Sequence, residues 1–122
     1  MTETREISSD ILRGHTDTVV LGALLDRDRY GYEIYNAILD RTEGVFELKE
    51  TTLYSSYKRL EREGHLSSYW GDETQGARRK YYAITAAGRE LFEQNKRDWE
   101  FTRQILDTLI LAKDAKGENY GQ

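Results

Sequence analysis

The sequence contains no cysteine and no proline in 122 residues. Without cysteine there are no disulfides, thiolate metal sites or cysteine nucleophiles, which fits a reducing compartment. Without proline there is no Pro-rich linker. No apolar run approaches the roughly 18 residues of a membrane span, and the N-terminal "MTETREISSD" has no hydrophobic signal region. We therefore predict a cytoplasmic protein.

Residues for catalysis are also scarce. The only two histidines are His15 and His65, and neither lies at metal-ligand spacing from a carboxylate. Hydrolytic chemistry needs a nucleophile, a base and an orienting group in one cleft, and the sequence indicates no such set. The isolated glycines form no phosphate loop. We predict no enzymatic activity, no catalytic residues, no metal and no cofactor. His65 is expected to border a helix, and His15 to be a packing residue.

The chain length predicts one domain with room for an appended element, and the 38% hydrophobic content supports only a modest core. Such a small core often gains stability by pairing with a second copy. The net charge of −4 argues mildly against a nucleic-acid partner. A basic stripe on one face would matter more than this sum.

Hydrophobic spacing and turn residues divide the chain into five elements. Gly64 is predicted to cap the third helix, and Thr85 to begin the last one. Gly14 and Gly22 weaken the continuity of the first helix. The expected elements are helices at 10–26, 30–42 and 51–63, a hairpin of strands 66–70 and 80–84, and a long helix at 85–113.

Three helices followed by a two-stranded hairpin form a winged helix-turn-helix. The predicted fold is mainly α with a small β-hairpin, and a long C-terminal dimerisation helix is added to it. We predict a winged helix-turn-helix DNA-binding domain at 1–84, the dimerisation helix at 85–113 and a disordered tail at 114–122.

The third helix has two different faces. Leu53, Tyr57 and Leu60 share one face, which predicts that it is buried. The opposite side, with Tyr54 on its flank, carries Thr51, Ser55, Lys58, Arg59 and Arg62. Hydroxyls and cations on one helix face can bind base edges and phosphates in the major groove. The alternative is an ordinary solvated helix with cations among glutamates.

The loop of the hairpin, or wing, gives a second signal. Gln75, Gly76, Arg78 and Arg79 lie where a wing meets the DNA backbone or minor groove. Lys80 extends this cluster. The alternative is a solvated loop that charge protects from aggregation, with Asp72 and Glu73 pairing with the cations.

The long helix carries a heptad pattern, with Phe92, Asn95, Trp99, Thr102, Leu106 and Leu109 spaced by alternating steps of three and four. This spacing predicts a homodimer whose interface includes Phe92, Trp99, Thr102, Leu106 and Leu109. The two winged helix-turn-helix domains of this dimer, which we call its heads, would meet half-sites about 34 Å apart on DNA. Leu91, Phe101, Ile105 and Ile110 would widen the apolar face. Trp70, in contrast, is expected to pack in the core.

Four segments together resemble the PadR family of bacterial transcriptional regulators over about residues 11–113. They are "LRGHTDTVVLGALL", "YGYEIYNAI", "LKETTLYSSYKRLEREGHLSSYWGD" and "GARRKYYAITAAGRELF". The resemblance implies a winged-helix homodimer that binds a pseudo-palindromic operator and usually represses. By matching positions, it implies DNA contacts at Lys49, Thr51, Thr52, Tyr54, Ser55, Lys58, Gln75, Gly76, Arg78 and Arg79.

The short chain is similar to the subfamily with a single C-terminal helix, and within it to multidrug-sensing repressors. Those proteins have a tryptophan at the position of Trp99, which sandwiches planar cationic drugs across the dimer axis. The implied ligand site contains Ile11, Thr18, Phe92, Asn95, Asp98 and Trp99. Lys96 and Arg103 add positive charge there, so a neutral or anionic planar ligand fits as well. Trp99 could also be only an interface anchor.

The sequence therefore predicts a sequence-specific DNA-binding regulator, in particular a repressor that a small planar ligand at the dimer interface relieves. The alternative is a winged-helix protein-interaction module that does not bind DNA, which the acidic net charge favours.

Overall fold

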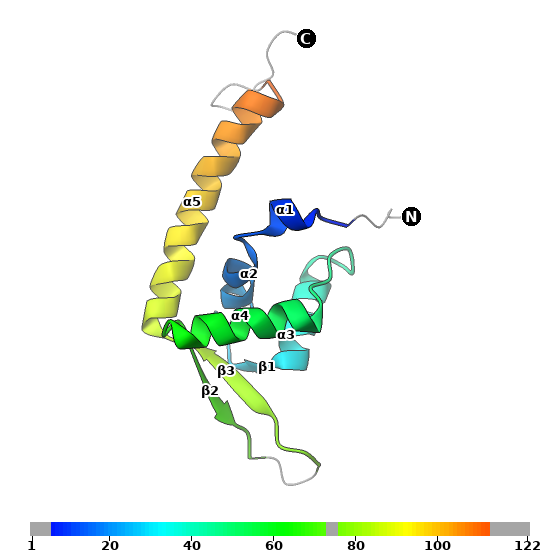
Figure 1. The fold of residues 1–122 in the computed structure, drawn as a ribbon, viewed down its shortest axis with the longest axis vertical. Coiled ribbons are helices and arrows are strands. Elements are labelled where there is room, and N and C mark those ends of the chain that lie inside the picture. Colours follow the sequence, from blue (N-terminus) through cyan, green and yellow to red (C-terminus); the bar gives the residue numbers. More distant parts are fainter. Residues whose placement is uncertain (1–5, 73–75, 113–122) are drawn as a thin grey trace. The chain divides into compact units, whose positions relative to one another are not determined.

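The computed structural model describes residues 6–72 and 76–112 and confirms the predicted fold class. The chain divides into two units, Met1–Phe92 and Glu93–Gln122. The last helix begins in the first unit and continues through the second. In chain order the elements are α1 (Ser9–Leu12), α2 (Thr16–Gly22), β1 (Arg29–Tyr30), α3 (Gly31–Arg41), α4 (Glu50–Arg62), β2 (Leu66–Trp70), β3 (Lys80–Ile84) and α5 (Ala86–Ile110) (Figure 1).

The prediction of one continuous helix over 10–26 is wrong, because the chain turns between α1 and α2. Gly14 has a φ of +89°, in the left-handed region that residues with a side chain rarely adopt. The amide of His15 donates to the carbonyl of Leu12 at 2.9 Å, which closes the turn. None of the residues of α1 is buried, whereas α2 buries Val20 and Leu21.

The hairpin is confirmed, but it belongs to a three-stranded antiparallel sheet with the order β1-β3-β2. β1 was not predicted; it has two residues and pairs Tyr30 with Tyr81. Arg29 holds this short strand to the end of α2. Its guanidinium donates to the carbonyl of Ala23 at 2.6 Å and pairs with Asp26 at 2.6 Å.

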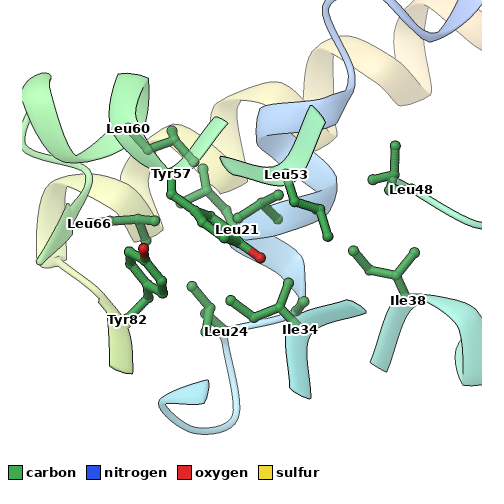
Figure 2. Packing of buried hydrophobic residues seen from close by; sticks show 12 residues of the cluster. Leu21, Leu24, Ile34, Ile38, Leu48, Leu53, Tyr57, Leu60, Leu66 and Tyr82 are labelled. Carbon is green, nitrogen blue, oxygen red and sulfur yellow. The ribbon is translucent and has the colours of Figure 1, made fainter. Parts of the chain in front are cut away.

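The core of the first unit is formed by side chains from α2, α3, α4 and the hairpin (Figure 2). Leu53, Tyr57 and Leu60 lie on one side of α4 and are buried, which confirms the predicted inward face. Leu21 of α2 and Ile34 of α3 are fully buried in the same cluster. Each such aliphatic side chain contributes about 2 kcal/mol through the removal of apolar surface from water. This burial fixes the rotation of α4 about its own axis.

The end of α4 is capped as predicted. Gly64 has a φ of +82°, and its amide donates to the carbonyl of Glu61 at 3.1 Å. The amide of His65 donates to the carbonyl of Leu60 at 2.8 Å. The two bonds form a Schellman motif, and they place His65 at the border of α4, as expected.

The beginning of α5 is tied to this same cap. The hydroxyl of Thr85 accepts the amide of Gly88 at 3.0 Å, which confirms Thr85 as the N-cap, and it donates to the carbonyl of Gly64 at 2.7 Å. A Cβ atom on Gly88 would lie 2.2 Å from the carbonyl oxygen of His65. Only glycine therefore allows α5 to begin this close to the end of α4.

In the second unit, α5 exposes several large apolar side chains. Phe101 is 65% exposed and Leu109 is 73% exposed, while Ile105, Leu106 and Ile110 are also exposed. No helix in the described part of the chain is both long and apolar enough to cross a membrane. The predicted tail at 114–122 lies outside the described residues.

Candidate nucleic-acid interface

The outward face of α4 presents the polar residues that the sequence predicts. Because the leucines and Tyr57 turn the opposite face into the core, this face is held toward solvent. Lys49 precedes the helix in an extended conformation, with φ −69° and ψ 152°. The predicted contact residues Lys49, Thr51, Thr52, Tyr54, Ser55 and Lys58 are all exposed.

Neighbouring side chains on this face contact one another. The Nζ atom of Lys58 lies 5.3 Å from the ring centroid of Tyr54, a cation–π contact one helical turn apart. The hydroxyl of Ser55 donates to the carbonyl of Thr51 at 3.1 Å. In this arrangement the Ser55 oxygen faces outward as a hydrogen-bond acceptor.

Arg59 differs from the prediction. Helical spacing predicts it on the outward face, but its guanidinium binds Asp17 of α2, with Nε 2.8 Å from Oδ2 and Nη2 2.6 Å from Oδ1. The hydroxyl of Ser56, which is fully buried, donates to Oδ1 at 2.6 Å. We call these three residues, Asp17, Ser56 and Arg59, the α2–α4 clamp. The clamp takes one cation away from the outward face and joins two helices instead.

The clamp favours the ionised carboxylate of Asp17. Burial alone would raise its pKa, but the hydrogen bonds from Arg59 and then from Ser56 outweigh burial. The pKa of Asp17 therefore lies below its ordinary value. Since the clamp requires the charged form, it is intact at neutral pH.

The wing carries the predicted cations on exposed backbone. Gly76 has a φ of +80° and is exposed, as are Arg78 and Arg79. Across the wing, the amide of Gly71 donates to the carbonyl of Arg79 at 2.7 Å. Gln75 and Glu73 lie outside the described residues. Among the ion pairs of the described residues, none joins Asp72 to a wing cation.

A series of aromatic contacts holds the wing cation Arg79 in position. Its guanidinium lies 4.8 Å from the ring centroid of Tyr30. Tyr30 meets Tyr81 edge-on at 5.5 Å, and Tyr81 stacks on Tyr69 at 5.6 Å. The hydroxyl of Tyr69 donates to Asp28 at 2.7 Å, which raises the pKa of Tyr69. The root of the wing is thereby fixed against β1 and the loop before it.

α4, the wing and the start of α3 enclose one groove of about 520 Å³, which we call the reading groove. Thr51 and Tyr54 from α4 and Arg79 from the wing all line it, so the structure brings together residues from both predicted parts of the site. Its wall also includes Tyr30, Tyr32 and Lys80. None of these three residues is among the predicted contacts, although Lys80 belongs to the predicted cluster of wing cations. Tyr30 was missed because only the pairing of β1 with β3 brings it to the wing.

Trp70 is a further correction. Its spacing from Leu66 predicts a core position, but 57% of it is exposed. It is the last residue of β2, a strand whose first residue, Leu66, is buried.

The residues of the predicted ligand site belong to both units. Ile11 is exposed on α1, whereas Thr18 and Phe92 line a single cavity of about 960 Å³ between α2 and α3. Asn95, Asp98 and Trp99 lie on the second unit. The ligand site that combines these residues stays a prediction.

The predicted dimer interface lies on α5. Phe92 packs partly against the core of the first unit. Trp99, Thr102, Leu106 and Leu109 are all exposed in the single chain. The interface itself stays a prediction.

Within residues 6–72 and 76–112, no three histidine, aspartate or glutamate side chains are grouped so that they could hold a metal ion. The outward face of α4 and the wing present exposed hydroxyls and cations, which can bind an extended anion.

Comparison with known proteins gives a consistent result. Residues 20–94 match the transcriptional regulator PadR-like family. "Uncharacterized protein X" of Lysinibacillus sphaericus is 42% identical over 104 residues, which cover 85% of this chain and 95% of that protein.

Solved structures agree with this match. A transcriptional regulator from Clostridium thermocellum is 43% identical with a TM-score of 0.78, over 85% of this chain and 98% of that one. A PadR family transcription regulator from Clostridium difficile R20291 is 35% identical with a TM-score of 0.70, over 80% of this chain and 99% of that one.

Proposed function

Because this chain belongs to the PadR-like family of transcriptional regulators, we propose that it is a DNA-binding repressor that reads a specific operator. The observation that carries the proposal is the reading groove, where Thr51, Tyr54 and Arg79 line one hollow. In this proposal α4 enters the major groove, while the wing contacts the adjacent backbone or minor groove.

The residues divide into two roles. Thr51, Tyr54 and Ser55 carry hydroxyls on the outward face of α4 and are suited to base edges. Lys49, Lys58, Arg78 and Arg79 are suited to phosphates, since they carry flexible or planar cations. Thr52, Gln75 and Gly76 complete the proposed contacts. The phosphate contacts would position the head, and the hydroxyls would select the sequence.

We propose that two copies pair along α5. PadR regulators bind DNA and typically dimerise, and the exposed heptad residues Trp99, Leu106 and Leu109 supply an apolar seam for a second copy. Two heads related by a dyad would read two half-sites about 34 Å apart, so the operator would be pseudo-palindromic.

We further propose that a planar ligand relieves repression. It would bind near Trp99 at the dimer interface, with Ile11, Thr18, Phe92, Asn95 and Asp98 around it. A ligand that prefers one spacing of the two heads would change how well they span both half-sites. Trp99→Ala should abolish the effect of a planar dye on operator binding. An unchanged dye response in this variant would exclude Trp99 as the ligand platform.

Selection of bound sequences from random duplex DNA tests the main proposal. We expect a symmetric motif, and a binding constant that falls with salt by roughly one log–log slope unit for each phosphate neutralised. A protein-interaction module would retain no duplex even in dilute buffer. That outcome would replace the proposed function with the alternative.

A further inference from the structure

Trp70 lies on the face of the wing that is turned toward α4. Side chains two residues apart in a strand share a face, so Leu66, Ser68 and Trp70 point the same way. Leu66 is only 2% exposed in the core, and the hydroxyl of Ser68 donates to Glu61 of α4 at 2.5 Å. The same face therefore passes from the core, along α4, to an exposed indole.

The neighbours of Trp70 on β3 belong to the reading groove. Trp70 is paired with Lys80 in the antiparallel register, and directly opposed side chains lie about 5 Å apart at Cβ. Lys80 and Tyr82 line the reading groove, and the Lys80 ammonium lies 5.8 Å from the Tyr82 ring centroid. The exposed indole is thus beside a cation that already faces the proposed DNA site.

We propose that Trp70 is a further DNA-contacting residue, whose indole packs on a deoxyribose of the strand that Lys80 and Arg79 hold. This inference rests on the proposed function and extends it to a residue outside the predicted contact set. In the complex, the indole Nε1–H would donate to a phosphate oxygen, while the ring covers the apolar face of the sugar.

The surrounding charge favours a nucleic-acid backbone over a protein surface. Arg78, Arg79 and Lys80 are consecutive and exposed, and Lys80 is paired with Trp70 across the two strands. An indole has one donor and no acceptor, so it complements a partner rich in acceptors. A DNA backbone offers anionic acceptors and apolar sugar carbons at a short repeat, which matches cations beside an aromatic ring.

Fluorescence tests the contact directly, because the chain has two tryptophans. In Trp99→Phe, the only indole is that of Trp70. When the selected duplex is added, we expect its emission to change and acrylamide quenching to fall by about twofold or more, since DNA covers the ring. Trp70→Phe, which reports only Trp99, is the matched control and should show a smaller change in acrylamide quenching.

Binding measurements complete the test. Trp70→Ala should weaken duplex binding by about tenfold, to a similar extent for operator and unrelated sequences, with an unchanged salt slope. Ser67→Ala, on the opposite face of β2, should bind like the parent protein. Normal duplex binding with unchanged Trp70 quenching and unchanged affinity of Trp70→Ala would overturn this inference alone. No duplex binding by the parent protein would overturn the proposed function as well.

Discussion

α4 and the part of α5 in the second unit are both amphipathic helices, but their apolar faces have different surroundings. α4 buries Leu53, Tyr57 and Leu60 in the core of its own unit, so its polar face is the one that faces solvent. After Phe92, α5 exposes Phe101 and Leu109. A helix whose apolar face is buried within its own chain can therefore offer its polar face to a ligand. A helix whose apolar face is exposed is suited instead to a second copy.

The largest expected effect comes from a change in the exposed apolar face of α5. Leu106→Asp places a charge in the proposed seam, so we expect monomers in analytical ultracentrifugation. A monomer meets one half-site instead of two, and operator affinity should fall by about a hundredfold or more. Gln104→Asp adds the same charge on the opposite side of the heptad and is the control. A dimeric Leu106→Asp protein would contradict the proposed seam.

The second largest effect is expected from removal of Tyr54, a side chain of α4 that we propose contacts base edges. Tyr54 is 56% exposed, so Tyr54→Ala should leave the fold intact. We expect operator affinity to fall by on the order of 2 kcal/mol, about 30-fold, while binding to unrelated duplexes changes little. The ratio of the two affinities, measured by fluorescence anisotropy, checks this prediction. Equal losses on both duplexes would assign Tyr54 to the backbone instead.

A change in the wing should have a smaller and less selective effect. Arg79→Ala is expected to weaken all duplexes by about tenfold and to lower the log–log salt slope by about one, since one phosphate contact is lost. Arg97→Ala removes the same charge from the second unit and should leave the slope unchanged. An unaltered slope in Arg79→Ala would show that this cation does not neutralise a phosphate.

The smallest expected effect comes from weakening the contact between α2 and α4, and it is an effect on stability. Asp17→Asn weakens the α2–α4 clamp, and we expect a loss of about 1 kcal/mol in the free energy of unfolding at pH 7, because 42% of the Arg59 side chain is exposed to solvent. Asp10→Asn, in an exposed pair with Arg13, should change stability by less than about 0.5 kcal/mol.

The pH dependence of the clamp follows from the pKa of Asp17. This pKa is lower in the folded state than the value of about 3.9 in the unfolded chain. The contribution of the clamp is therefore complete above about pH 4 and is lost as the pH falls through the folded-state pKa. The difference in stability between the parent protein and Asp17→Asn, from urea unfolding, should shrink as the pH is lowered below 4. A constant difference would contradict the assigned role of the Asp17 charge.

Sequence periodicity predicted α3, α4 and both strands of the hairpin, because their boundaries depend on nearby residues. Gly64 and Thr85 mark helix ends through contacts within a few residues or with an adjacent segment. The division of α4 into an apolar and a polar face was also evident, since 3.6 residues per turn place Leu53, Tyr57 and Leu60 together. The exposed contact residues on α4 follow from that same pattern.

Contacts between distant segments decided the rest. β1 exists because Tyr30 pairs with Tyr81, and two residues carry no periodic signal of their own. Arg59 lies with Lys58 and Arg62 in the sequence, but it forms an ion pair with Asp17 of another helix, α2. Trp70 shares a strand face with buried Leu66, yet 57% of it is exposed, because burial depends on the packing of other segments and not on strand alternation alone.

By itself, the sequence determined α3, α4, α5 and the two hairpin strands, and which side of α4 is apolar, because these depend on local spacing. The tertiary structure decided which cations remain available and which aromatic rings meet the wing. Those outcomes depend on the distance between side chains that lie far apart along the chain.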